Sequence, residues 1–268
     1  MNIILLTIES EFESAKNLGF ETVTELPGYT EDYNNFIIIR WGNSRMNYNK
    51  LGIRQDFKNV INKARDIRNN CIKHNSLKKL SEVVKIPEFY KENSLLNEYY
   101  VVRPIQHSRG TGFEIKKSPL EINPYEKYAI KFIKTDLEYR VWFCAGKTFC
   151  CTRVPLKKLG NIIGEFPCRA EYGYSYCDID PKLHNLTIKA FKHLNLEFGA
   201  ADVLCKDGEY YWTELNTACS LDAGKVIKFY KENITDLINS KFPNWNKKKK
   251  TYRKKNKIKT NKKIADNR

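Results

Sequence analysis

The chain has 268 residues, 41% of them hydrophobic and 13% aromatic, which is enough to bury a sizeable core and excludes a wholly disordered protein. No run of about 18 apolar residues occurs, which excludes a membrane-spanning helix, and the first residues lack the basic segment of a signal peptide. The formal net charge of +16 is concentrated in residues 247 to 268, which carry 12 Lys or Arg and one acid.

The eight cysteines are spread along the chain without a Cys-x-x-Cys pair, and only four histidines accompany them. This spacing argues against a zinc site. Without an export signal, we expect reduced thiols and a cytoplasmic protein that does not contact a membrane.

The first part of the chain contains two short apolar runs, Ile3–Leu6 and Phe36–Ile39. Continuous, β-branched runs of this length are typical of strands buried on both faces of a parallel sheet. The polar stretch Arg40–Ser44 follows the second run, either as part of a ligand-binding edge or as an ordinary exit from the strand. Apolar spacing predicts one helix over Asp56–Asn70 and another over Ser76–Val84 with Ser76 as its N-cap.

The middle of the chain reads as strands that alternate with turns. The predicted strands are Tyr99–Pro104, Phe113–Ile115, Lys127–Ile133, Tyr139–Cys144 and Thr148–Thr152. A helix is predicted over residues 181 to 195, because apolar side chains recur there at helical spacing.

A polar loop, His107–Gly112, follows the first of these strands and its terminal Arg103-Pro104 pair. Glycines allow backbone N–H groups to approach an anion closely, and arginine binds phosphate oxygens through two hydrogen bonds. The loop is therefore a candidate phosphate site, although a short glycine-bearing turn between strands is also an ordinary structural feature.

The segment Phe198–Asn216 reads as a hairpin of two strands joined by a Lys-Asp-Gly turn. Asp202 lies on the first strand, and Glu214 and Asn216 lie two residues apart on the second, so both side chains leave the same face. Carboxylate and amide oxygens suit Mg²⁺. The alternative is a hairpin whose acidic side chains are simply solvated.

Taken in chain order, these segments resemble an ATP-grasp protein, and they are similar to the short carboxylate–amine ligase-like members found in phages and bacteria. The matching features are a lysine near a helix start, an arginine before a proline, a glycine loop, an acid-plus-arginine strand and a closing Asp…Glu-x-Asn set. In this sequence they are represented by Lys73, Arg103, His107–Gly112, Glu138 with Arg140, and Asp202 with Glu214 and Asn216.

The resemblance implies an α/β (α+β) fold with ATP-grasp architecture, in which two α+β subdomains grip ATP after a small parallel α/β N-terminal domain. The expected divisions are residues 1–70 for the N-terminal domain, 71–130 for the small subdomain with the glycine-rich loop, 131–245 for the large subdomain and 246–268 for a basic tail. The composition of the tail predicts disorder.

The resemblance also assigns expected roles to individual residues, with ATP and Mg²⁺ as the cofactors. Contacts to ATP are expected from Lys73, Arg103, Ser108, Arg109, Gly110, Thr111, Gly112, Lys131, Phe132, Ile133 and Glu138. Mg²⁺ is expected on Asp202, Glu214 and Asn216. Arg140 is the expected catalytic arginine, and Arg153 and Arg169 are candidates for the arginine that stabilises an acyl phosphate, with a surface position as the alternative for each.

The implied function is an ATP-dependent ligase that activates a substrate carboxylate as an acyl phosphate for attack by an amine, on small-molecule or peptide substrates. The segment Thr217–Leu221 lacks the Pro and Gly that the family usually has there, so the sequence does not identify the substrate. Cys219, beside the metal motif, is either a nucleophile or a buried thiol, and the absence of a histidine partner favours the latter.

A second hypothesis is a non-catalytic or drifted ATP-binding module, tethered to nucleic acid or to an acidic partner through the basic tail. The tail could instead recruit a macromolecular substrate, or it could be a solubilising extension of biased composition. The retention of all three proposed metal ligands favours the enzyme over the module. The sequence carries no indication of an oligomeric state.

Overall fold

A computed structural model describes residues 2–91, 97–105, 112–118, 120–155, 158–159, 166–167, 172–221 and 223–245. Contacts divide the chain into two compact units. The first contains the described residues of Met1–Trp41, Arg45–Ile61 and Ser220–Arg268, and the second contains those of Gly42–Ser44 and Asn62–Cys219. The division at residues 70, 130 and 245 expected from the family resemblance stays a prediction.

The first unit is built on a four-stranded parallel sheet in the order β2-β1-β3-β6. Its strands are β1 (Asn2–Thr7), β2 (Glu21–Val23), β3 (Phe36–Trp41) and β6 (Val60–Ile61). The central strands β1 and β3 are nearly inaccessible to solvent over Ile4–Leu6 and Ile37–Trp41, as the two apolar runs predicted. Arg40 and Trp41, predicted as part of a loop, belong to β3.

The helix predicted over Asp56–Asn70 is wrong in its first half. Val60 and Ile61 form β6 and pair with Ile38 and Ile39 of β3, and only Ala64–Cys71 is helical (α2). Asn62, between the two elements, has a φ of 57°, a left-handed conformation that separates strand from helix. The apolar positions do face a core, but those before Asn62 belong to the sheet.

The second predicted helix also begins earlier than expected, because α3 spans Lys73–Leu80. Ser76 therefore lies inside the helix and is not its N-cap. Its hydroxyl donates a 2.8 Å hydrogen bond to Asn70 Oδ1, which joins α3 to α2. Asn70 in turn donates to the Leu215 carbonyl at 2.8 Å, so the side chains of this helix pair reach the strand β16 (Glu209–Asn216).

The longest helix of the described residues, α5 (Gly224–Lys241), has no counterpart among the predicted elements. Its buried positions Val226, Tyr230, Ile234 and Ile238 recur every four residues, so a periodicity signal was present in the sequence. Within the first unit, Tyr230 packs edge-on against Trp41 at 5.0 Å between ring centroids. No helix in the described residues is long and apolar enough to cross a membrane.

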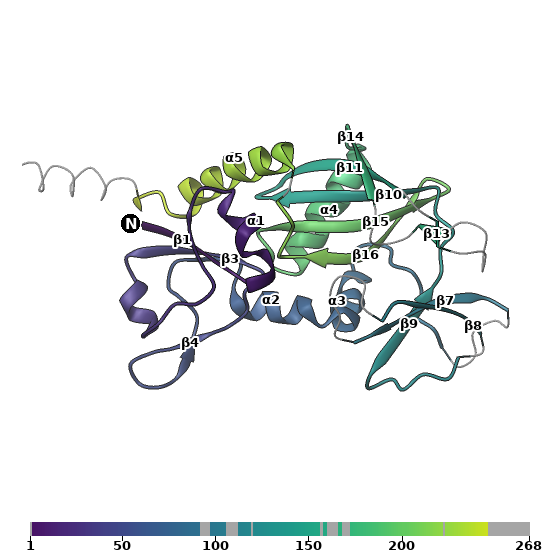
Figure 1. Ribbon diagram of the computed structural model, residues 1–268, viewed down its shortest axis with the longest axis horizontal. Coiled ribbons are helices and arrows are strands. Elements are labelled where there is room, and N and C mark those ends of the chain that lie inside the picture. Colours follow the sequence, from purple (N-terminus) through teal and green to yellow (C-terminus); the bar gives the residue numbers. More distant parts are fainter. Residues whose placement is uncertain are drawn as a thin grey trace, which may run out of the picture. The chain divides into compact units, whose positions relative to one another are not determined.

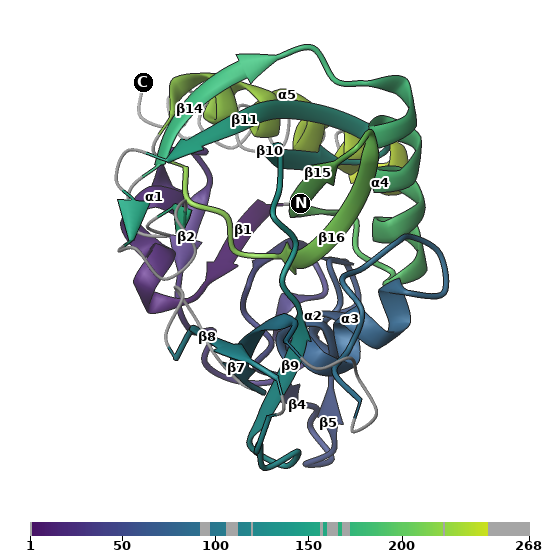
Figure 2. The same ribbon diagram turned by 90° about the vertical axis from the view of Figure 1, so that its right-hand side faces the viewer.

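The second unit contains a three-stranded antiparallel sheet in the order β8-β7-β9 and a five-stranded antiparallel sheet in the order β14-β11-β10-β15-β16 (Figure 1, Figure 2). The smaller sheet consists of β7 (Tyr99–Pro104), β8 (Glu114–Lys117) and β9 (Lys127–Lys131). The larger sheet adds to β16 the strands β10 (Leu137–Cys144), β11 (Lys147–Pro155), β14 (Tyr172–Cys177) and β15 (Phe198–Lys206).

Helix α4 (Pro181–His193) packs on one face of the larger sheet, as Figure 2 shows. Phe191 of α4 stacks on Phe143 of β10 with ring centroids 4.4 Å apart. Asp180 caps the helix by accepting hydrogen bonds from the backbone N–H groups of Lys182 and Leu183. Side chains alternate along a strand, so every second residue of β10 packs into the core between the sheet and α4. Glu138, Arg140 and Trp142 lie on the opposite face of the sheet.

The remaining elements are short. They are η1 (Glu9–Glu11), α1 (Phe12–Lys16), η2 (Thr30–Tyr33) and the hairpin of β4 (Asn47–Tyr48) with β5 (Arg54–Gln55) in the first unit, and the hairpin of β12 (Lys158–Leu159) with β13 (Phe166–Pro167) in the second. The mixed composition of helices, a small parallel sheet near the N-terminus and larger antiparallel sheets confirms the predicted fold class.

Gly199 permits a close approach of β15, β16 and α4. A Cβ atom at this position would lie 2.5 Å from the Asn216 carbonyl oxygen and 2.8 Å from a ring carbon of Phe191. We expect Gly199→Ala to lower the free energy of unfolding by about 1–3 kcal/mol, because backbone and core must shift to admit the methyl group. Urea unfolding measures this difference.

The control is Gly224→Ala, because a Cβ at residue 224 meets no heavy atom within 4 Å. It should leave the free energy of unfolding within about 0.5 kcal/mol of the wild-type value. Equal effects of the two substitutions would contradict the argument from close packing.

Candidate active site

The hairpin of β15 and β16 has an irregularity at its centre. Asp202 pairs with Glu214, but the next pair along β15 is Val203 with Trp212, so Thr213 is an extra residue on β16. Regular alternation would place Trp212 and Glu214 on the same face. The bulge instead directs Trp212 into the core, where it is fully buried, while Glu214 lies opposite Asp202.

The three predicted metal ligands lie on adjacent strands of this hairpin. Asp202 is directly opposite Glu214, and Asn216 is opposite Ala200, two residues before Asp202. These residues offer two carboxylates and one amide oxygen, which are hard donors of the kind that Mg²⁺ binds. No group of three His, Cys, Asp or Glu side chains that could hold a metal occurs in the described parts of the chain, and the set here contains only two carboxylates beside its amide.

Four cationic side chains converge on the two carboxylates. Arg140 Nη1 and Arg153 Nη2 lie 2.6 and 3.0 Å from Asp202 Oδ1. Lys73 Nζ lies 3.9 Å from Glu214 Oε1, and Arg103 Nη1 lies 3.6 Å from Glu214 Oε2. The cluster of Lys73, Arg103, Arg140, Arg153, Asp202, Glu214 and Asn216, hereafter the charge cluster, therefore contains four positive and two negative charges.

Lys73 is positioned by the start of α3 and by the backbone of β16. Its ammonium group donates to the Leu215 carbonyl at 2.7 Å and lies 3.4 Å from Asn216 Oδ1. The helix that carries Lys73 follows α2, whose Asn70 bonds the same Leu215 carbonyl. The two helices thus fix the ammonium group beside the proposed metal ligands, although these residues are some 140 positions apart in sequence.

The charges are held in a poorly solvated environment. The side chains of the six charged members are each less than a fifth exposed. Burial alone raises the pKa of Glu214, but Lys73 and Arg103 outweigh this effect, so the pKa lies below its ordinary value. Burial likewise acts to lower the pKa of Arg140, and the neighbouring Asp202 reverses the shift and raises it. The shifts favour the charged forms of Glu214 and Arg140.

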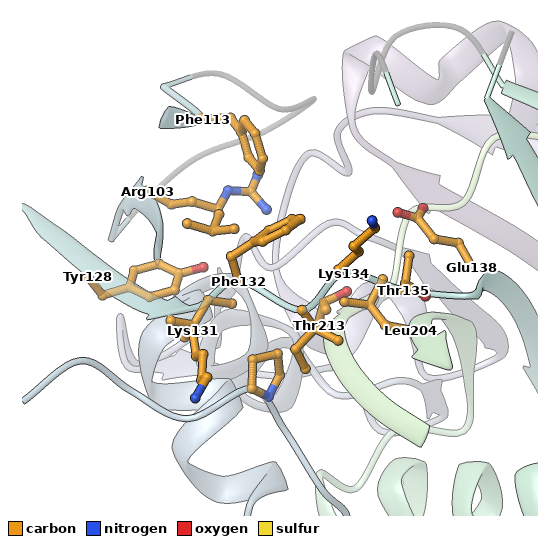
Figure 3. Close-up of a pocket in the computed structure, with 14 residues that line it drawn as sticks. Arg103, Phe113, Tyr128, Lys131, Phe132, Lys134, Thr135, Glu138, Leu204 and Thr213 are labelled. Atoms are coloured by element: carbon orange, nitrogen blue, oxygen red, sulfur yellow. The ribbon is translucent and has the colours of Figure 1, made fainter. Parts of the chain in front are cut away.

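A pocket lies next to the charge cluster, between the two sheets of the second unit (Figure 3). Arg103 belongs to both the pocket and the cluster. Lys131, Phe132, Ile133 and Glu138, predicted to contact ATP, all line it. Several further lining residues carry no motif in the sequence, because they come from separate elements: Val101, Phe113, Tyr128, Ile130, Lys134, Thr135, Leu204 and Thr213.

The side chain of Lys131 does not point into this pocket toward the cluster. Figure 3 shows it directed away from the Arg103 guanidinium. Its ammonium group pairs with Glu98 Oε1 at 2.5 Å, and this hydrogen bond raises the pKa of Lys131. Lys131 therefore lines the pocket with the part of the residue that precedes its ammonium group. Lys134, three residues later, points toward Glu138 in the same view.

Part of the predicted phosphate loop, Ser108, Arg109, Gly110 and Thr111, lies outside the described residues, as does Arg169. Gly112 is described and has a φ of 68°, a conformation that glycine adopts without strain. A Cβ there would lie 2.6 Å from Cγ of Pro104. Gly112 thus allows the chain to turn closely against the end of β7 and back into β8.

Cys219 is fully buried, and its thiol lies 3.5 Å from the Asn216 carbonyl oxygen. This position is consistent with the prediction of a buried thiol beside the metal motif. It places a small apolar side chain at the exit of β16, where the chain leaves the charge cluster.

No protein-family model matches the chain, and no curated protein matches it in sequence. Solved structures do match. D-alanine–D-alanine ligase from Bacillus anthracis complexed with ATP aligns with 92% of this chain and 99% of its own, at 14% identity and a TM-score of 0.57. The ATP-grasp ligase PsnB complexed with a minimal precursor, Mg and ADP aligns with 84% of this chain and 91% of its own, at 13% identity and a TM-score of 0.53.

A RiPP-associated ATP-grasp ligase from Chryseobacterium gregarium, in complex with ADP and a leader and core peptide, aligns with 90% of this chain and 97% of its own, at 12% identity and a TM-score of 0.52. A PsnB complex with a phosphomimetic variant of the minimal precursor matches at a TM-score of 0.44, and this chain spans 55% of that one. The similarity lies in the arrangement of helices and strands at low sequence identity. The chain has the ATP-grasp fold.

Proposed function

We propose that the protein is an ATP-dependent ligase that activates a substrate carboxylate as an acyl phosphate, which an amine then attacks. The observation that carries the proposal is the charge cluster: four cations, two carboxylates and an amide beside a pocket that shares Arg103 with them, within an ATP-grasp fold. The solved ligases of this fold are complexed with ATP or with ADP, and one of them with Mg.

The residues of the charge cluster suit Mg²⁺ and a polyphosphate. The cluster contains more cations than carboxylates, and cationic side chains of low exposure suit the binding of a polyphosphate anion. A triphosphate supplies that anion, and its charge requires the metal that Asp202, Glu214 and Asn216 would hold. Bound Mg²⁺ would neutralise and orient phosphate oxygens there.

In this proposal, the pocket beside the cluster takes the nucleoside. Phe132 and Ile133 provide an apolar wall for the base. The backbone N–H groups of Lys131 and Phe132 are bonded to the carbonyls of Glu88 and Tyr99. Lys73 and Arg103 bind phosphate oxygens, and arginine does so with a rigid pair of donors. Ser108, Arg109, Gly110, Thr111 and Gly112 remain proposed as the loop that covers the phosphates.

The chemistry requires positioning and charge stabilisation more than covalent participation by the protein. An oxygen of the substrate carboxylate attacks the γ-phosphorus, ADP leaves, and the amine then displaces phosphate from the acyl carbon. Arg140 and Arg153 lie where they can stabilise negative charge on the transferring group, because both already hold the Asp202 carboxylate. Arg169 stays a proposal without a described position.

The substrates proposed are a carboxylate and an amine, either small molecules or parts of a peptide. The solved ligases with this fold include both kinds, since one is a D-alanine–D-alanine ligase and two are complexed with precursor peptides. The segment Thr217–Leu221, which lacks the Pro and Gly usual in the family, follows the proposed metal ligand Asn216. Two of its side chains, Cys219 and Leu221, are fully buried.

The proposed function is tested at Glu214, whose carboxylate is the centre of the proposed metal site. We expect Mg²⁺-dependent ATP binding by the purified protein and ADP release when pooled amino acids and short peptides are added. Glu214→Gln should weaken Mg²⁺-dependent binding by roughly tenfold or more, because a charged metal ligand is lost. Calorimetry measures binding, and a coupled assay measures ADP.

The matched control is Glu126→Gln, which changes an exposed glutamate of the same unit and should alter neither quantity. Absence of nucleotide binding by the wild-type protein would contradict the proposed function. Nucleotide binding that is never followed by ADP release, with any pool, would instead support the non-catalytic ATP-binding module.

The charge cluster also predicts a stability effect in the protein without nucleotide. Asp202→Asn removes the partner that Arg140 and Arg153 share, and should lower the free energy of unfolding by about 3 kcal/mol, because buried charges lose their compensation. Asp136→Asn weakens an exposed pair with Lys206 and should cost much less, because solvent screens exposed ion pairs. Comparable losses in the two variants, measured by urea unfolding, would show that the cluster is well solvated.

The basic tail supports a further test of how substrates reach the site. If residues 247 to 268 recruit an acidic or nucleic-acid substrate, deleting them should raise KM for that substrate and leave the Kd for ATP unchanged. Steady-state kinetics and calorimetry measure the two quantities separately. Identical KM values with and without the tail would rule out recruitment.

A further inference from the structure

A second and larger groove lies beside the nucleotide pocket of the second unit. The two share Pro87 and residues 131 to 134, so the groove continues on the other side of the chain segment that lines the pocket. Its remaining walls come from the end of α3, from residues 83 to 91, from the start of β7, from the start of α4 and from the tip of the β15–β16 hairpin. At about 1390 Å³ it is larger than the sites that hold single small molecules, about 300–1,000 Å³.

The rim of this groove is strongly basic. It contains three glutamates, Glu88, Glu98 and Glu209, and seven lysines, Lys78, Lys85, Lys91, Lys131, Lys134, Lys182 and Lys206. Seven positive and three negative charges give a surplus of four. Some of these lysines have acidic partners: Lys85 and Lys182 share Glu209, Lys131 pairs with Glu98, and Lys206 pairs with Asp136 and Asp207 outside the groove.

The floor of the groove is apolar. Val84, Tyr100 and Tyr210 are buried there, and Ile86, Phe89 and Leu186 are partly buried. Lysines at the rim above an apolar floor suit a ligand that has acidic groups along one side and apolar groups along the other. An extended peptide with alternating acidic and apolar residues has this character, because its side chains point to opposite sides in turn.

We propose that the groove binds an extended segment of an acidic polypeptide. Lysines of the rim would pair with carboxylates of the segment, and its apolar side chains would cover the floor. That the bound segment is part of the ligase substrate rests on the proposed function. That the groove binds such a segment does not.

Single-stranded nucleic acid fits the groove less well. Binding of that kind uses exposed aromatic rings on which bases stack, and none of the large exposed hydrophobic residues in the described chain lies in the groove. The three glutamates would also oppose a continuous phosphate backbone, while spaced carboxylates can avoid them.

The test uses the full chain and a fluorescein-labelled 12-residue peptide that alternates glutamate with leucine. Fluorescence anisotropy is measured without nucleotide. Lys78→Glu with Lys182→Glu reverses two exposed lysines of the groove, one on α3 and one on α4. The matched control, Lys79→Glu with Lys189→Glu, reverses two exposed lysines on the same helices that do not line the groove.

Both double variants change the net charge equally and keep the basic tail, so general attraction to the protein is the same in each. We expect the groove variant to raise the Kd for the peptide roughly tenfold and the control variant to change it less than about twofold. Replacing glutamate by glutamine in the peptide should abolish the difference. Lys78→Gln with Lys182→Gln repeats the comparison if circular dichroism shows that charge reversal disturbs folding.

Equal losses in the two variants, or no peptide binding by the wild-type protein, would overturn the proposal. Tighter binding of a 12-nucleotide oligouridylate that the groove variant alone abolishes would overturn it in favour of RNA. Calorimetry with Mg-ATP is run in parallel, and neither Lys78 nor Lys182 lines the nucleotide pocket. Failure of peptide binding with intact ATP binding therefore rejects the groove alone, and failure of ATP binding rejects the ligase proposal alone.

Discussion

The site depends on one extra residue in β16. Thr213 interrupts the regular pairing of β16 with β15, and its hydroxyl bonds the Asp202 carbonyl at 3.1 Å. Because of this bulge, Trp212 faces the core while Glu214 faces Asp202. A regular strand would send both residues to one face, and either the core would lose its indole or the site would lose its carboxylate. Packing and chemistry are satisfied together only through this irregularity.

Once Glu214 and Asp202 lie opposite each other, two carboxylates are partly buried next to one another and need compensation. Four cations supply it, and they come from separate elements: α3, β7, β10 and β11. The same cations outnumber the two carboxylates. Lysine and arginine side chains that hold carboxylates are of the kind that also bind phosphate oxygens, as the proposed function requires.

The segment from Lys131 to Lys134 connects the two binding regions of the second unit. Its residues line both the pocket beside the charge cluster and the basic groove. The ammonium group of Lys131 pairs with Glu98 of the groove, while Phe132 and Ile133 line both regions. A ligand in the groove would therefore contact the same short stretch of chain that the proposed nucleotide contacts.

The sequence alone determined the elements whose signals are local. Strand β7 has the predicted bounds, the hairpin turn at Asp207 and Gly208 adopts the positive φ angles that Asp-Gly favours, and α4 follows its apolar period. Order along the chain was enough to indicate the ATP-grasp fold. Tertiary structure decided that Val60 and Ile61 form a strand, because pairing with β3 outweighs a helical pattern. Tertiary structure also decided the bulge at Thr213 and the direction of the Lys131 side chain. It brought Lys73 and Arg153 to the acidic residues of the hairpin. These features depend on contacts between segments that are distant in sequence, and no local sequence pattern predicts them.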